Sequence, residues 1–203
     1  MADNIKEHIY DWRNTLKQAE IIKQMSHKEV RQQLLLSQSI FFLLSIALSF
    51  ILFDHIFDWF TLFTLDIKQI ILYGILTGLA LVIVEIILDR VIPQKYMDDG
   101  GINEKVFKGQ SILHIFIIAL VVAISEEFLF RGVIQVTFGY VFASTLFVLV
   151  HIRYLKKPFL LVAIIITSFL IGYLFEVTQN LFVPIAFHFI VDFLLGVYIK
   201  MKK

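Results

Sequence analysis

The sequence lacks cysteine and long basic runs, and only 17% of its residues are charged. Without cysteine, the chain has no disulfides, no thiolate metal ligands and no cysteine nucleophile. Without a basic block, nucleic acid is not an expected partner. Any chemistry must therefore use Glu, Asp, His or Ser side chains.

Hydrophobic residues dominate what is present. They make up 59% of the 203 residues and include 21 Phe, and the mean hydropathy is +0.82. This is more apolar surface than a soluble domain of this length could bury. We therefore expect an all-α polytopic protein of the cell membrane, with the lipid bilayer as its surroundings.

Six apolar stretches each approach the roughly 20 residues that a helix needs to span hydrocarbon. The fourth is the shortest if it ends at His151, and adequate if it continues into Tyr154. Six Lys and Arg residues precede the first span, and the following segments hold one, four, none, three, none and three. The positive-inside rule then predicts that both termini are cytoplasmic. The expected spans are Leu34–Phe53, Gln69–Leu88, Ser111–Phe138, Val141–Tyr154, Phe159–Phe175 and Leu181–Ile199.

These spans divide the chain into three parts. Residues 1–33 have apolar residues at helical spacing, which predicts a cytoplasmic amphipathic arm on the membrane surface or a solvated helix packed on a loop. Residues 34–110 hold two spans and a cytoplasmic loop, 91–110, with no evident role. In the second span, Gly74 and Gly78 would let a neighbouring helix approach closely. Glu85 is expected to anchor that span at the interface or to contribute to a substrate path. Residues 111–203 form a four-helix core.

Three ionisable residues, Glu126, Glu127 and Arg131, lie inside the third span. Charged groups at this depth are costly and usually face a protein interior or a water-filled cavity. At about 100° per residue, Glu127 and Arg131 lie about 40° apart on one face and can pair, whereas Glu126 points about 100° away. Glu126 is left as the candidate general base. A buried ion pair that only fixes helix packing would explain Glu127 and Arg131 but not Glu126.

Two later spans each carry a histidine with a partner four residues away. Phe147 can pack against His151, and His188 shares a helix face with Asp192. The second pair is typical of two metal ligands, of a base with its orienting acid, or of a structural hydrogen bond. At 1.5 Å per residue, Glu126 and His151 lie roughly 18–20 Å from the turn between spans three and four. His188 and Asp192 lie roughly 10 and 16 Å from the start of span six, so a convergent cluster is allowed.

These motifs, taken in order, resemble those of the CPBP family of intramembrane proteases. This is the CAAX prenyl protease and bacteriocin-processing group, also called Abi, and the similarity covers about Ile112 to Val197. The resemblance implies a membrane-associated peptide or protein substrate and an attacking water activated by Glu126 and His151. It also implies that Glu127 with Arg131 supports them, and that His188 with Asp192 stabilises the oxyanion. The motifs are Glu126-Glu127-x-x-x-Arg131, Phe147-x-x-x-His151 and His188-x-x-x-Asp192.

Position 192 departs from the family pattern, which often has Asn there. Asn can donate a hydrogen bond to an oxyanion, whereas an ionised Asp only accepts. The oxyanion role therefore requires Asp192 to be protonated or to be oriented on His188. Zinc is an alternative, because these side chains offer the ligand atoms it takes, although no H-E-x-x-H pair is present. We favour the metal-independent reaction. The zinc ligands would be Glu126, His151, His188 and Asp192.

The sequence thus predicts an intramembrane endopeptidase that uses a water activated by Glu and His. The alternative is a non-proteolytic membrane scaffold or bacteriocin-immunity-type protein that keeps the polar cluster for packing or for binding a partner. A proton-coupled transporter is a weaker expectation, since neither inverted repeats nor paired interrupted helices are evident. In an enzyme, Glu126→Gln should abolish activity with little loss of folding, whereas in a scaffold it should lower stability.

Overall fold

The computed structural model of the chain describes residues 24–97, 99–155 and 157–202. Within these ranges every regular element is a helix, so the all-α expectation is confirmed. Most of the predicted N-terminal arm lies outside the described residues, and its last part, from His27, belongs to the first described helix.

Five helical segments are long and apolar enough to cross a membrane. Two of them join several elements without a break: α3 (Ile67–Gln69), η2 (Ile70–Ile75) and α4 (Leu76–Val91), then α7 (Ile112–Glu127), η3 (Phe128–Gln135) and α8 (Val136–Phe138). The other three are α2 (His27–Leu52), α10 (Pro158–Thr178) and α11 (Phe182–Met201). The short elements are η1 (Ile56–Leu62), α5 (Gln94–Met97), α6 (Ile102–Phe107), α9 (Tyr140–Val150) and η4 (Ile152–Tyr154).

The fourth predicted span is shorter than expected. Helix α9 has 11 residues, which at 1.5 Å per residue cover about 17 Å of a hydrocarbon core of about 30 Å. It ends because the backbone of His151 leaves the helical region, with φ −83° and ψ 50°. His151 is therefore a helix-terminal residue beside the short helix η4.

Side-chain caps explain where several helices begin. Ser26 accepts a hydrogen bond from the backbone N–H of Glu29, whose carboxylate accepts from the N–H of Ser26. This capping box starts α2 well before the apolar run. Ser111 caps α7 by accepting a hydrogen bond from the backbone N–H of His114, and Pro158 occupies the first turn of α10, where its missing N–H costs nothing.

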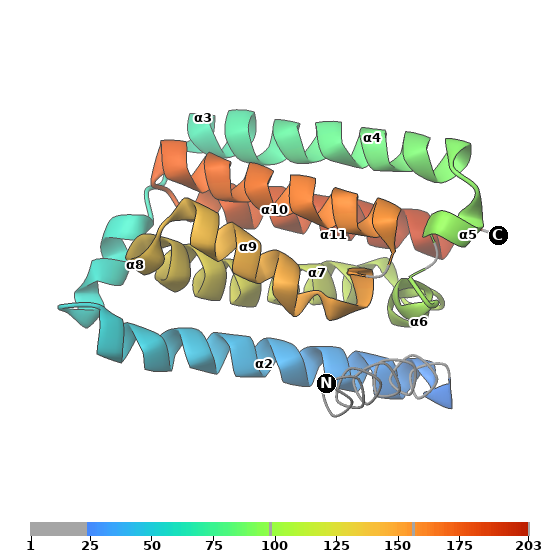
Figure 1. Cartoon of the computed structure of the whole chain (residues 1–203), viewed down its shortest axis with the longest axis horizontal. Coiled ribbons are helices and arrows are strands. Elements are labelled where there is room, and N and C mark those ends of the chain that lie inside the picture. The colour runs from blue at the N-terminus through green and yellow to red at the C-terminus, as the bar shows by residue number, and fades with distance from the viewer. Residues whose placement is uncertain (1–23, 98, 156, 203) are drawn as a thin grey trace, which may run out of the picture.

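The helices are arranged around α7 and α11, which pack against each other. Helix α2 packs against α7 and η3, while α11 also contacts η2 and α4. Figure 1 shows α2 and the α3–α4 segment at opposite edges, with α7, α9, α10 and α11 between them. In the segment from α7 to α8, half of the 18-residue apolar stretch is buried inside the protein, whereas in α2 only 17% is. The helix that carries the charged motif is thus the one most enclosed by protein.

The beginning of α2 and the end of α11 lie at the same end of the molecule as α5 and α6 (Figure 1). His27 Nδ1 lies 3.1 Å from the Lys105 carbonyl oxygen, and Lys202 forms a 2.7 Å ion pair with Asp89. Five long helices and the shorter α9 make an even number of passes among the described residues, which brings both ends together as the predicted topology requires. The cytoplasmic location of this end stays a prediction from the distribution of Lys and Arg.

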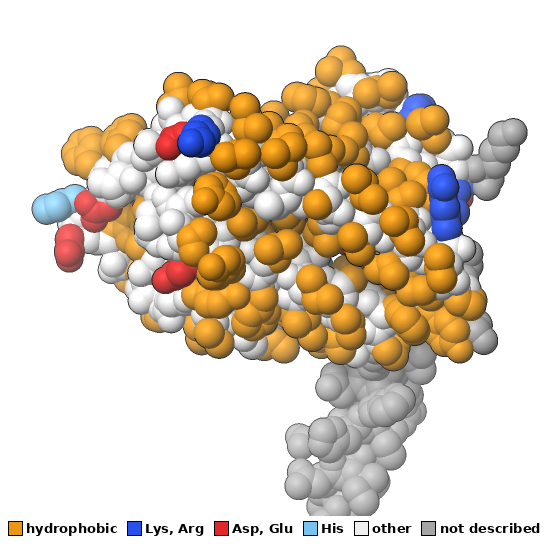
Figure 2. Space-filling view, turned by 90° about the horizontal axis from the view of Figure 1, so that it is seen from above, with side chains coloured by type: hydrophobic (Ala, Val, Ile, Leu, Met, Phe, Trp, Pro, Cys, Tyr) orange, Lys and Arg blue, Asp and Glu red, His pale blue; other side chains and the backbone are white. Residues whose placement is uncertain are grey.

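Hydrophobic side chains cover most of the face seen in Figure 2, and charged side chains lie mainly toward its two ends. Large apolar residues on the outer helices are exposed, among them Leu43 at 64% and Ile83 at 59%. A surface of this kind is suited to lipid. The chain is therefore a multi-pass membrane protein.

The close helix approach predicted at Gly74 and Gly78 is confirmed. A Cβ atom at Gly74 would lie 2.9 Å from the carbonyl oxygen of Val183, and one at Gly78 would lie 3.1 Å from that of Phe187. Both carbonyls belong to α11, so the two glycines allow the η2–α4 segment to lie against the backbone of α11. His188 follows Phe187 directly, so this contact also fixes the position of His188 along the axis of the helix bundle.

Candidate active site

The helix that carries the charged motif changes geometry immediately after Glu127. Residues 128–135 form a π-helix, η3, and π-turns inside α-helices are frequent at functional sites. Despite the wider turn, Arg131 Nε lies 3.3 Å from Glu127 Oε2, and Arg131 Nη1 lies 3.4 Å from Oε1. The predicted pairing of Glu127 with Arg131 is therefore present, with both side chains fully buried.

Arg131 also ties η3 to the neighbouring helices. Its Nη2 donates to the carbonyl oxygen of Ser168 at 3.0 Å, and its guanidinium lies 4.6 Å from the centre of the Phe147 ring. Ser168 in turn donates to the carbonyl oxygen of Ser144 at 2.9 Å. Arg131 thus contacts α9 and α10 as well as Glu127, which holds three segments in one arrangement.

His188 lies between two carboxylates. Its Nδ1 is 2.7 Å from Glu127 Oε1, whereas its Nε2 is 3.5 Å from Asp192 Oδ2. The predicted pair of His188 with Asp192 is present, but the shorter contact is with Glu127. Because ionised carboxylates only accept hydrogen bonds, the doubly protonated ring is the form that donates to both. Glu127 is then flanked by two cations, Arg131 and His188.

His151 is held by its own helix end. Its Nδ1 lies 2.7 Å from the carbonyl oxygen of Phe147, and the two rings lie 4.7 Å apart, which is the packing predicted from their spacing. On the other side Tyr154 stacks at 6.0 Å. A carbonyl oxygen can only accept, so Nδ1 carries the hydrogen and the Nε2 of the neutral ring keeps its lone pair. His151 is thereby an oriented acceptor.

Glu126 is nearly buried, at 6% exposure, and has a partner that the sequence analysis missed. Its Oε1 accepts a 2.9 Å hydrogen bond from Nε2 of Gln38 on α2, and Gln38 Oε1 accepts a 2.7 Å bond from Ser125. Gln38 lies in the first predicted span. A glutamine within an otherwise apolar run is a signal that could have identified it, because buried amides in membranes need a partner.

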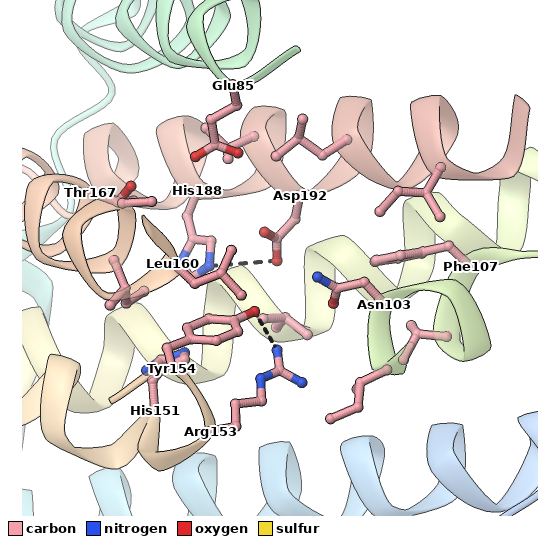
Figure 3. Close-up of a pocket in the computed structure, with 18 of the residues that line it drawn as sticks. Glu85, Asn103, Phe107, His151, Arg153, Tyr154, Leu160, Thr167, His188 and Asp192 are labelled. Atoms are coloured by element: carbon pink, nitrogen blue, oxygen red, sulfur yellow. Dashed lines mark hydrogen bonds and ion pairs between the residues drawn. The ribbon is translucent and has the colours of Figure 1, made fainter. Parts of the chain in front are cut away.

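Glu126, His151, His188 and Asp192 all line one cavity of about 590 Å³. In Figure 3, His188 and Asp192 point into it from α11, His151 lies beside the end of α9, and the Glu85 carboxylate points toward it from α4. Glu85 is therefore part of the cavity wall, and its contribution to a substrate path stays a prediction.

The segment 91–110 forms another wall of this cavity. It contains the short helices α5 and α6, and Asn103 and Phe107 of α6 are among the lining residues labelled in Figure 3. Val106 is almost fully buried, at 3% exposure. The segment is therefore more than a connection between spans, since side chains of α6 line the cavity.

The side chains present do not fit a zinc ion as they are arranged. In the ranges that the structure describes, no three His, Asp or Glu side chains are grouped closely enough to hold a metal. His188 turns both ring nitrogens toward carboxylates, and Glu126 turns one oxygen toward Gln38. A tetrahedral site needs three or four converging ligand atoms.

Comparisons with known proteins point to one family. Residues 108–194, which include all six residues of the predicted site, match the family described as type II CAAX prenyl endopeptidase Rce1-like. An uncharacterised protein of Bacillus subtilis strain 168, YpbD, is 37% identical over 150 residues, which are 74% of this chain and 79% of that protein. No solved structure gives a significant match.

Proposed function

The chain belongs to the Rce1-like family of type II CAAX prenyl endopeptidases, and we propose that it hydrolyses peptide bonds of membrane-associated substrates with a water activated by Glu126 and His151. One observation carries this proposal. The Glu126 carboxylate and the His151 ring line the same cavity. Among the described residues only one oxygen of Glu126 has a hydrogen-bond partner, which leaves the other for a water molecule.

The first step is proton transfer from that water. Its two hydrogens face Glu126 and the acceptor Nε2 of His151, which together fix its orientation. Glu126 takes one proton, and the hydroxide oxygen forms a bond to the carbonyl carbon of the substrate. The electron pair of the carbonyl double bond moves to oxygen and gives a tetrahedral oxyanion.

In this mechanism His188 stabilises the developing negative charge on the oxyanion. Its Nδ1 is held at 2.7 Å by Glu127, whereas its Nε2 is only loosely engaged, 3.5 Å from Asp192. The Nε2–H is therefore the donor that can turn to the oxyanion without losing the anchor. Arg131 supports this arrangement by fixing Glu127.

The intermediate collapses when the oxyanion re-forms the carbonyl double bond and the carbon–nitrogen bond breaks. Glu126 returns its proton to the leaving nitrogen, so that the products are a carboxyl group and a free amine. The carboxylate is regenerated at the end of the cycle. Each proton and electron pair is accounted for by residues of this chain and one water molecule.

The substrate class is a peptide or protein that reaches the cavity from the membrane. The family includes enzymes named for prenylated substrates, and whether this chain requires a prenyl group is a matter for the assay. The cavity extends toward the end of the molecule that holds α6 and the Asp89–Lys202 pair. We place this end in the cytoplasm, together with both termini, because the Lys and Arg residues are concentrated there.

The test is cleavage by purified protein in liposomes. The probes are a farnesylated peptide with a CAAX terminus and a panel of unprenylated single-span peptides, and the products are identified by mass spectrometry. We expect Glu126→Gln to lower kcat by about 10²- to 10⁴-fold, the usual contribution of a general base. The exposed variant Glu104→Gln serves as the matched control. A Glu126→Gln protein that cleaves at the wild-type rate contradicts the proposed mechanism.

A scaffold or immunity-type protein is the second candidate, favoured by the contacts of Arg131 with Glu127 and Ser168, which join helices without any need for chemistry. It predicts no cleavage of either probe and a lower melting temperature for Glu126→Gln. Zinc is tested in the same preparation by metal analysis and by chelation. Activity that survives removal of bound metal eliminates the zinc-dependent reaction.

A further inference from the structure

A polar side chain from outside the family-matched segment reaches the candidate base. Gln38 lies on α2, which packs against α7 and is otherwise largely apolar. Its side chain is only 3% exposed. It donates to Glu126 Oε1 at 2.9 Å and accepts from Ser125 Oγ at 2.7 Å. The amide therefore bridges two consecutive residues of α7.

An amide inside a membrane protein is expensive to bury unless it is hydrogen-bonded. Helix α2 would insert more readily with an apolar residue at position 38, so packing alone gives no reason for glutamine. The partners of Gln38 are the candidate base and its neighbour, and no contact of Gln38 with Glu127 is present among those that the structure describes. The side chain therefore acts on Glu126 specifically.

We propose that Gln38, oriented by Ser125, is the positioning residue of Glu126. It holds one carboxylate oxygen against α2 so that the other faces the cavity and His151. This inference rests on the proposed general-base role of Glu126 and goes beyond it, because it makes α2 a part of the catalytic unit. The family match begins at residue 108 and does not include this helix.

The amide of Gln38 suits both protonation states of a general base. When Glu126 is ionised, Nε2 donates to it and Ser125 donates to the amide oxygen. When the cavity-facing oxygen of Glu126 has taken a proton, the other oxygen remains an acceptor, so Nε2 of Gln38 still donates to it. The amide therefore keeps its orientation through the proton transfer.

The principal variant is Gln38→Met, which keeps the length of the side chain and removes its hydrogen bonds. We expect kcat on the cleaved probe to fall by about 10- to 100-fold, the range for a hydrogen bond to a charged group and for a misplaced reacting group. KM should be unchanged, because Gln38 does not line the cavity. Gln32→Met, on an exposed position of the same helix, is the control and should keep the wild-type kcat.

Two further measurements separate positioning from a structural role. In the Glu126→Gln background, Gln38→Met should lower the residual rate no further, whereas general damage to the fold would multiply the losses. Ser125→Ala should lower kcat by about 3- to 10-fold, less than Gln38→Met because only the orientation of the amide is lost. The Gln38→Met/Ser125→Ala double variant should be no slower than Gln38→Met alone.

Each outcome decides a different point. If Gln38→Met keeps the wild-type kcat while Glu126→Gln is inactive, the positioning role is wrong and the proposed function stands. If Glu126→Gln is fully active, the general-base role of Glu126 fails and the positioning role of Gln38 fails with it. If neither the wild-type protein nor any variant cleaves a probe, the proposed function itself fails. If Gln38→Met does not fold, Ser125→Ala decides: an unchanged kcat overturns the inference and a reduced kcat with unchanged KM supports it.

Discussion

Removal of the Arg131 charge should destabilise the protein far more than removal of a surface charge. Arg131 is fully buried, with Glu127 Oε2 at 3.3 Å and the Ser168 carbonyl oxygen at 3.0 Å. In Arg131→Met, the Glu127 carboxylate keeps only His188, and the Ser168 oxygen loses a donor. Loss of one partner of a buried pair costs about 3–5 kcal/mol in the free energy of unfolding. We expect Arg131→Met to fall in that range.

The double variant Glu127→Gln/Arg131→Met tests the physical reason. It removes both charges together, so no uncompensated carboxylate is left in the protein interior. Replacement of a whole buried pair is often close to neutral, and the double variant should therefore recover more than half of the single variant's loss. The coupling between the two substitutions then measures the cost of the unpaired charge.

Reversible unfolding in mixed detergent micelles gives the required free energies. The matched control is Lys108→Met, which breaks the Glu104–Lys108 pair, whose side chains are 54% and 48% exposed. Exposed pairs contribute about 0–1 kcal/mol, so this variant should change little. The reasoning is refuted if Arg131→Met lowers the free energy of unfolding by no more than Lys108→Met does. It is also refuted if the double variant is as unstable as Arg131→Met alone.

Two further predictions concern α11. Gly74→Ala should lower the free energy of unfolding by about 1–3 kcal/mol. The reason is that the Cβ of the new alanine would lie 2.9 Å from the backbone oxygen of Val183. Thermal unfolding of the purified variant measures this loss. Asp192→Asn should cleave the probe at least as fast as wild type, because the amide can donate to an oxyanion and the carboxylate cannot. A tenfold or larger loss of kcat in Asp192→Asn would mean that the charge of Asp192, rather than a donor, is needed there.

Local patterns predicted much of the fold and part of the site. Long apolar runs must form helices in a membrane, since every backbone polar group needs an internal partner. The pairing of Glu127 with Arg131 and the packing of Phe147 on His151 follow from residues four apart on one helix. The glycines at 74 and 78 predicted a close approach because the absence of a side chain has a direct steric meaning.

Contacts between distant segments could not be predicted in this way. Gln38 and Glu126 are 88 residues apart, and their hydrogen bond depends on how α2 rotates against α7. His188 lies closer to Glu127 than to Asp192. This contact depends on the position of α11 along its axis relative to α7, to within about 1.5 Å, the rise of one residue. The residues of α6 line the cavity without forming any recognisable motif in the sequence.

The two adjacent carboxylates show why these distant contacts decide the chemistry. Glu127 faces Arg131 and His188, so its charge is neutralised by cations and it serves to hold them. Glu126 accepts from a neutral amide through one oxygen and lines the cavity, so no cation neutralises it among the contacts described. Identical side chains one residue apart thus differ in role because they point toward different helices. The helices that make this difference are α11, which lies largely within the family-matched segment, and α2, which lies outside it. In the mechanism that we propose, the catalytic unit therefore begins at α2, because the segment from 108 to 194 holds the reacting groups but not the amide that orients one of them.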